Sequence, residues 1–113
     1  MKHLSYKGYT GSIEYSREDD LFFGKVLGIR SLISYEGKTG KDLEKDFQEA
    51  VDFYLEDCTE NKREPEKPFK GSFNVRISPK LHYKAAVLAH EEQISLNSFV
   101  EESIRDKIEK ESK

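Results

Sequence analysis

A polar segment at residues 62–71 constrains the fold of this chain more than any other feature. Its two prolines, Pro65 and Pro68, have a fixed φ and no backbone N–H, so a helix cannot continue through them. We therefore expect a linker there, between a first module at residues 1–61 and a second module at residues 72–113. A module of about 42 residues seldom buries enough apolar surface to fold alone, so the second module should be an obligate oligomer.

Charge is distributed unevenly over the 113 residues, although the net charge is only −3. Residues 1–61 carry 8 Lys or Arg and 13 Asp or Glu, a net charge of −5. Residues 62–90 carry 7 basic and 2 acidic residues, a net charge of +5, and residues 91–113 return to −3. An acidic module followed by a basic block indicates two partners of different chemistry.

The composition excludes several classes of protein. No apolar run approaches the roughly 20 residues that a membrane-spanning helix needs, and residues 1–11 lack the apolar core of a secretory signal. Cys58 is the single cysteine, so a disulfide within the chain is excluded, and three scattered histidines do not supply the ligand pattern of structural zinc. We therefore expect a protein of the reducing cytoplasm, without a metal, a cofactor or a membrane.

The first module shows the pattern of a small α+β fold. Polar residues occupy every second position from Thr10 to Ser16, between Tyr9, Gly11, Ile13 and Tyr15. Two further strand-like runs cover residues 21–27 and 29–35. Three short strands with tight turns predict a small three-stranded antiparallel sheet. Thr39 is then placed to cap a helix whose apolar stripe can cover one face of the sheet. The stripe consists of Leu43, Phe47, Ala50, Val51, Tyr54, Leu55 and Cys58.

Phe53 does not belong to this stripe, because it falls about 100° from the centre of the stripe around the helix. Two interpretations stay open: an aromatic side chain at the edge of the core, or a contact for a partner protein. Cys58 has no histidine near it in sequence, so we expect a small buried hydrophobe rather than a nucleophile. The acidic turn Glu18–Asp20 has no second acidic motif with ligand spacing, so we expect it to be solvated.

The second module begins with a strictly alternating segment, Ser72–Ser78, which predicts a strand. Pro79 suits the first position of a following helix, which should run to about Glu92, and Ser95 can cap a second helix. One strand cannot satisfy its own backbone groups, so it should pair with the same strand of a second chain around a two-fold axis. The predicted dimer core consists of Phe73, Val75, Ile77, Leu88, Phe99, Val100 and Ile104.

Strand, helix and helix in this order resemble the ribbon-helix-helix fold of the Arc/MetJ class of dimeric repressors. The resemblance rests on Phe73–Pro79 and Ser95–Val100. Paired strands of that class lie in the DNA major groove, which implies base-reading roles for Ser72, Asn74 and Arg76. The implied phosphate contacts are Ser95, Leu96, Asn97 and Lys80. The alternative is that these polar side chains are only solvated, as is usual for one face of a strand.

The two modules together resemble the HicB family of antitoxins. The first module carries this resemblance in Tyr9–Ser16, Phe23–Ile29 and Ala50–Cys58. The resemblance implies a partial RNase H-like domain, without a nuclease site, that binds and blocks a small mRNA-cleaving toxin, HicA. It also implies that an intertwined homodimer, or a higher oligomer, binds operator DNA and represses the operon. No residue would be catalytic, and Phe53 is a candidate toxin contact.

Two other functions stay open. One is a ribbon-helix-helix repressor that responds to a metabolite, although no Gly-rich phosphate loop supports it. The other is a metal-dependent RNase H-like nuclease with residual activity. That chemistry needs several carboxylates that converge on two metal ions, whereas Glu14 is the single carboxylate within the predicted strands.

Overall fold

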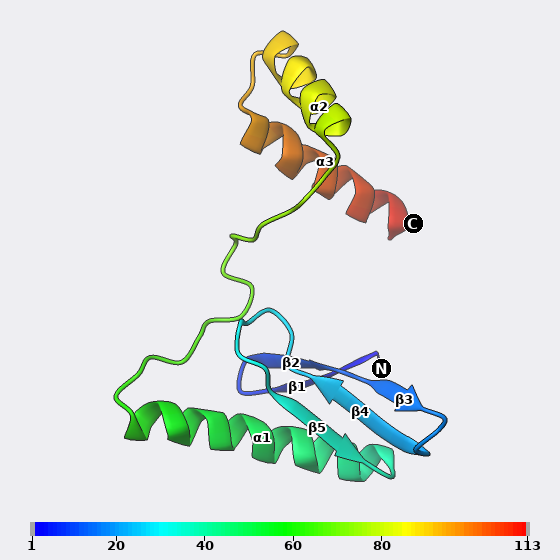
Figure 1. The fold of residues 1–113 in the computed structure, drawn as a ribbon, viewed down its shortest axis with the longest axis vertical. Helices are drawn as coiled ribbons and strands as arrows, with labels where there is room; N and C mark the ends of the chain where they lie inside the picture. Colours follow the sequence, from blue (N-terminus) through cyan, green and yellow to red (C-terminus); the bar gives the residue numbers. More distant parts are fainter. Residues whose placement is uncertain (1, 113) are drawn as a thin grey trace. The chain divides into compact units, whose positions relative to one another are not determined.

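The computed structural model describes residues 2–112 and divides into two compact units, one ending at Ser72 and one beginning at Phe73 (Figure 1). Within the described residues, the first unit contains five strands and one helix, and the second contains two helices. These elements confirm the α+β class that the sequence predicts.

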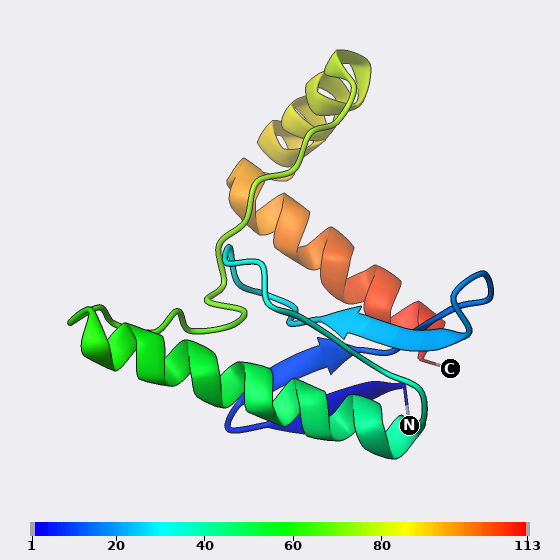
Figure 2. The ribbon, with the colours of Figure 1, turned by 60° about the horizontal axis from the view of Figure 1, so that its bottom comes forward.

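The strands of the first unit form two small antiparallel sheets. They are β1 (His3–Tyr6), β2 (Tyr9–Ser12), β3 (Glu14–Ser16), β4 (Leu21–Lys25) and β5 (Ser34–Gly37). β1 pairs with β2, and β4 lies between β3 and β5. A bridge between Gly11 and Val26, with a 2.8 Å hydrogen bond from Leu27 N to Thr10 O, joins β2 to the end of β4. The two sheets therefore form one layer, and α1 (Gly40–Glu60) lies across one face of it (Figure 2).

The predicted three-stranded antiparallel sheet exists as β3, β4 and β5, but its strands have other bounds. The predicted strand at residues 9–16 is interrupted at Ile13, which separates β2 from β3. The sequence prediction missed β1, whose hairpin to β2 turns on Lys7 and Gly8 with φ of 50° and 83°. The predicted strand at residues 29–35 is wrong, because β5 begins only at its end.

α1 covers the sheet with the apolar stripe that the sequence predicts. Thr39 caps the helix, and its side-chain oxygen accepts a hydrogen bond of 3.1 Å from Asp42 N. The fully buried members of the stripe are Leu43, Phe47, Val51 and Cys58. The partly buried members are Ala50, Tyr54 and Leu55. The prediction that Cys58 is a small buried hydrophobe is thus confirmed.

Tyr35 on β5 connects the sheet to α1 where two glycines leave space. Its hydroxyl donates a 2.8 Å hydrogen bond to the carbonyl oxygen of Ser12, and its ring centroid lies 5.0 Å from that of Phe47. A Cβ atom on Gly11 would overlap the Tyr35 hydroxyl, and one on Gly24 would overlap the Ser12 carbonyl. Burial raises the pKa of the Tyr35 phenol to about 12, so the hydroxyl keeps the proton that it donates.

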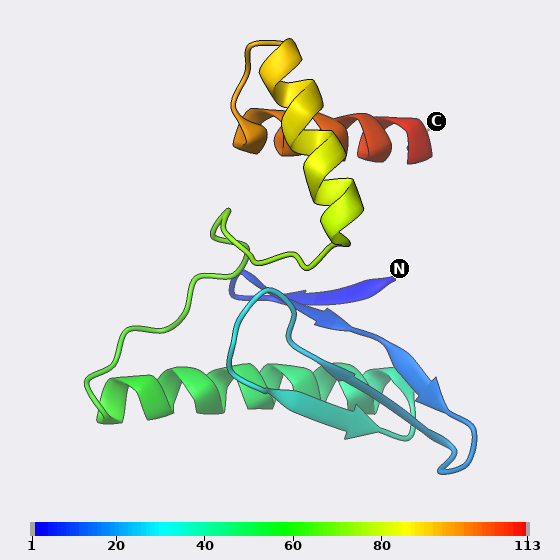
Figure 3. The same cartoon turned by 45° about the horizontal axis from the view of Figure 1, so that its top comes forward.

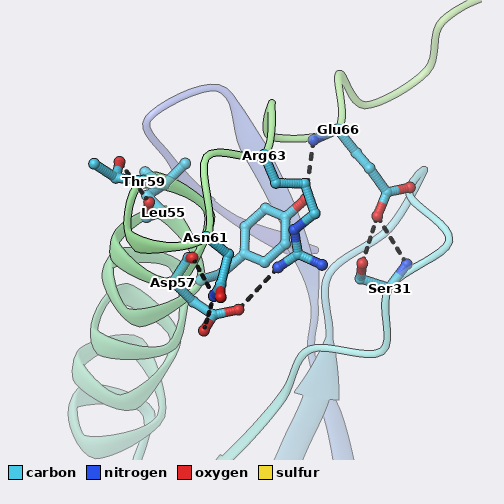
Figure 4. Close-up of polar contacts among 8 residues, drawn as sticks. Ser31, Leu55, Asp57, Thr59, Asn61, Arg63 and Glu66 are labelled. Atoms are coloured by element: carbon cyan, nitrogen blue, oxygen red, sulfur yellow. Dashed lines mark hydrogen bonds and ion pairs between the residues drawn. The ribbon is translucent and has the colours of Figure 1, made fainter.

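Residues 62–69, within the expected linker, form a strap that packs against the first unit. Near its start, the Arg63 guanidinium forms an ion pair of 2.8 Å with Asp57 on α1 (Figure 4). At its end, Phe69 N donates a 3.2 Å hydrogen bond to Gly28 O, and the Phe69 ring lies where a Cβ atom of Gly28 would be. The strap therefore belongs to the first unit by its contacts.

Glu66 makes the most hydrogen bonds of the strap. Its carboxylate accepts hydrogen bonds from the Ser31 hydroxyl and, at 3.0 Å, from the Ser31 N–H (Figure 4). It also accepts one of 2.7 Å from Arg30 N. Its own N–H donates to the Tyr54 hydroxyl at 2.9 Å, and its carbonyl accepts from the Tyr9 hydroxyl at 3.0 Å. The N–H groups of Arg30 and Ser31, in the loop after β4, thus donate to a side chain and not to a neighbouring strand. This is the physical reason that the loop is not a strand. Hydrogen bonds from Ser31 and from Arg30 N lower the pKa of the Glu66 carboxyl.

The second unit consists of an extended segment followed by two helices, α2 (Pro79–Glu91) and α3 (Leu96–Glu111) (Figure 3). Both helices begin where the sequence predicts, with the hydroxyls of Ser78 and Ser95 as N-caps. Gln93, with φ of 60°, turns the chain between them. Capping and the turn depend on residues close together in the chain, so the sequence alone indicates them.

Gly24→Ala should lower the free energy of unfolding by about 1–3 kcal/mol, the usual cost of adding a methyl group to a packed site. The new Cβ would meet the Ser12 carbonyl and the Tyr35 hydroxyl, and the backbone atom cannot move aside as a flexible side chain would. Urea unfolding followed by circular dichroism measures the change. Gly40→Ala is the control, because a Cβ atom there meets nothing within 4 Å. Equal losses in the two variants would contradict the packing argument.

Glu66→Gln should destabilise the chain by about 1–2 kcal/mol at neutral pH, because an amide oxygen is a weaker acceptor than a carboxylate. The folded pKa of Glu66 is lowered, so the wild type has its full advantage above the ordinary value of 4.5 and loses it as the pH falls through the lowered value. Thermal unfolding of both proteins between neutral and acidic pH measures this convergence. Glu64→Gln, at an exposed position of the strap, is the control and should change stability little. A gap between wild type and Glu66→Gln that stays constant with pH would argue against this role.

Candidate nucleic-acid and partner-protein interfaces

Residues 72–78 run as an extended chain that joins no strand within the described residues 2–112 (Figure 1). The predicted base-reading residues in it are Ser72, Asn74 and Arg76, all exposed. The apolar side chains between them are exposed as well, by 72% for Phe73 and 64% for Val75. The backbone groups of this segment need a partner or water. Its pairing with a second chain stays a prediction, and the extended conformation is compatible with it.

The start of α3 has the groups that the resemblance assigns to a phosphate contact. The Ser95 hydroxyl accepts a hydrogen bond of 3.0 Å from Ser98 N and so serves as the cap. The N–H groups of Leu96 and Asn97 lie in the first turn, where an α-helix has no internal acceptor for them. With the positive end of the helix dipole, such groups can bind an anion. Lys80 is exposed in the first turn of α2.

The helices of the second unit leave most of their apolar side chains uncovered. Among residues 73–112, Ala89 is the single fully buried residue. Phe99 of the predicted dimer core is half-buried. The exposed members of that predicted core are Phe73, Val75, Ile77, Leu88, Val100 and Ile104. A unit that buries so little of itself needs a further surface to cover its apolar face.

Phe53 on α1 is 72% exposed, so little of its ring belongs to the core. It lines a groove of about 410 Å³ together with Leu32, which is 81% exposed, with half-buried Ile33 and with Arg63 of the strap. Leu32 is not predictable as a surface residue from the sequence, because the run at residues 29–35 that contains it has the composition of a strand. The neighbouring residues in the sequence do not indicate that Leu32 is exposed, because the conformation of its loop depends on hydrogen bonds to the distant Glu66.

Two carboxylates of the acidic turn between β3 and β4 accept hydrogen bonds from hydroxyl groups of β3. Asp20 accepts a hydrogen bond of 2.7 Å from the Tyr15 hydroxyl, and Asp19 accepts one of 3.2 Å from the Ser16 hydroxyl. The bond to Asp20 raises the pKa of the Tyr15 phenol. Across residues 2–112, no group of three or more His, Cys, Asp or Glu is arranged to hold a metal ion. No helix in this part of the chain has the length and hydrophobicity that a membrane span requires.

The HicB family model matches residues 54–104 of this chain. The matched stretch runs from the last turns of α1 through the strap, the extended segment and α2 into α3. Comparisons with curated proteins and with solved structures find no match. This match makes residues 54–104 similar to the HicB family, and it supports a role related to toxin–antitoxin systems.

Proposed function

We propose that this chain is an antitoxin that blocks a HicA-like, mRNA-cleaving toxin and represses its own operon as a DNA-bound dimer. The observation that carries the proposal is the extended segment at residues 72–78, with apolar and polar side chains at alternate positions and all of them exposed. A strand of this kind has one face for a core and one face for DNA. The function needs no catalytic residue and no cofactor.

Dimerisation follows from the uncovered apolar face of the second unit. Two copies of residues 72–78 can pair as an antiparallel ribbon around a two-fold axis, which satisfies the backbone groups of both. Phe73, Val75 and Ile77 then lie on one side of the ribbon, where the helices of both chains cover them. The helices contribute Leu88, Phe99, Val100 and Ile104 to this dimer core.

The opposite side of the ribbon carries the side chains that read DNA. Ribbons of this kind place two strands in the major groove. Arg76 suits a guanine edge, because its guanidinium donates two parallel hydrogen bonds, whereas Asn74 suits an adenine edge and Ser72 suits either. The proposed phosphate contacts are Lys80 and, at the start of α3, Ser95, Leu96 and Asn97.

The negative charge of the first unit supports the proposed binding of the toxin. Residues 1–61 carry a net charge of −5, and the whole first unit, which ends at Ser72 and includes the basic strap, carries −3. A negative charge complements a protein that binds RNA through a basic surface. An antitoxin that covers this surface excludes the RNA substrate by occupancy alone. Neutralisation of the toxin therefore needs only a stable complex, not a chemical step.

Arg76→Ala should weaken operator binding by about 1–3 kcal/mol, because it removes a bidentate contact to one base pair. Gel-shift titration at fixed salt, with DNA from the promoter of the chain's own operon, measures the change. Arg105→Ala is the matched control, since Arg105 lies on α3 and pairs with Glu101 at 2.7 Å. Toxin binding should be the same in all three proteins. An operator affinity unchanged by Arg76→Ala would remove this residue from the base-reading set.

Ile77→Glu should convert the dimer to a monomer, because a carboxylate in the apolar dimer core would lose its hydration. Asn74→Glu, on the other face of the same segment, should leave the dimer intact and abolish operator binding by repulsion from the phosphates. Sedimentation equilibrium at several protein concentrations measures the mass of each variant. A dimeric Ile77→Glu variant would rule out the proposed ribbon.

A further inference from the structure

An exposed aromatic side chain lies on the outer surface of α1. Phe53 is 72% exposed and lines the groove of about 410 Å³ that Leu32 and Arg63 also line. Leu32 is 81% exposed and follows the two loop residues whose N–H groups Glu66 binds. Two large apolar side chains with this exposure at one groove are unfavourable in water, and such patches mark interaction surfaces.

Carboxylates surround Phe53 on the same face of α1. At about 100° per residue, every charged residue within roughly 60° of Phe53 around the helix is acidic. We call these acidic residues the acidic stripe. Its carboxylates are Asp42, Asp46, Glu49, Glu56, Asp57 and Glu60. The nearest basic position around the helix is Lys45, at the edge of the stripe.

Several of these carboxylates have no partner among the described residues. Asp57 pairs with Arg63 at 2.8 Å, and Asp46 accepts a hydrogen bond of 2.9 Å from Glu36 N. The carboxylates that make no hydrogen bond or ion pair within residues 2–112 are those of Asp42, Glu49, Glu56 and Glu60, all exposed. Neighbouring like charges on one helix face repel each other, so a positively charged partner would relieve this repulsion.

We propose that Phe53, Leu32 and the acidic stripe form the surface on which the toxin docks. This inference rests on the proposed antitoxin function and names the surface that performs it. The partner places an apolar side chain in the groove and basic side chains along the stripe. A protein that binds RNA phosphates has such basic side chains, and the carboxylates of the stripe occupy them in place of phosphates.

The charge of the stripe argues against two other occupants. A nucleic acid would bring its phosphates against the carboxylates of α1. A second copy of this chain, related by a two-fold axis, would set the stripe against itself with like charges opposed. A basic protein is the occupant that both the apolar and the charged parts of the surface favour.

The test measures binding of the full chain to the toxin encoded beside it, by calorimetry at low and high salt. Phe53→Ser and Leu32→Ser should each weaken binding more than about tenfold, the effect of removing a central apolar contact. Glu49→Lys combined with Glu56→Lys should weaken binding more at low salt than at high salt, because salt screens the repulsion. Thermal unfolding followed by circular dichroism should match that of the wild type, which shows that the first unit of each variant is folded. Operator binding, which the proposal assigns to residues 72–113, should stay unchanged.

Two variants are matched controls. Glu44→Lys reverses a charge on α1 at about 180° from Phe53 around the helix. Phe23→Ser removes an aromatic side chain that is 38% exposed on β4, on the sheet face turned away from α1. Both controls should bind the toxin as the wild type does.

The outcomes separate the two proposals. A wild-type chain that does not bind the toxin would overturn the proposed function and, with it, the docking surface. Wild-type binding that Phe53→Ser and Leu32→Ser leave unchanged would overturn the docking surface alone. A changed oligomeric state of Phe53→Ser with unchanged toxin affinity would assign the groove to a second copy of the chain and would also overturn it.

Discussion

The phenol of Tyr35 lies in a space that exists because Gly11 and Gly24 have no side chains. From this space its hydroxyl reaches the Ser12 carbonyl, and its ring contacts Phe47 of α1. One side chain therefore holds β2, β4, β5 and α1 in a single arrangement. The position of α1 on the sheet depends on this contact, and so does the outward placement of the acidic residues on its other face.

The strap adds a second, polar constraint on the same unit. Glu66 connects three parts that are distant in sequence: the loop after β4, Tyr54 on α1 and Tyr9 on β2. That loop carries Leu32, and the strap carries Arg63, both of which line the groove. The apolar groove thus depends on hydrogen bonds, because the loop and the strap that form its walls are held in place by Glu66.

The second unit buries few of its apolar side chains within one chain. Within residues 73–112 its one fully buried residue is Ala89, so its own helices enclose very little apolar surface. In the proposed dimer, pairing of the extended segments would complete the core and align the polar side chains in one row. Folding, dimerisation and DNA recognition would then be one event. The first unit, by contrast, completes its core within one chain, and its exposed groove is free to bind a different partner.

Local chemistry allowed the helices to be predicted from the sequence. A cap acts within three residues, and an apolar stripe repeats with each turn, so both are visible in a short window. The predicted caps that the structure contains are Thr39, Ser78 and Ser95. The alternation of residues 72–78 likewise indicated a two-faced segment. Only the tertiary structure decided that the run at residues 29–33 is a loop, because Glu66 binds Ser31 from 35 residues away. It also decided that Leu32 and Phe53 line one groove, since no local pattern records which apolar side chains remain uncovered.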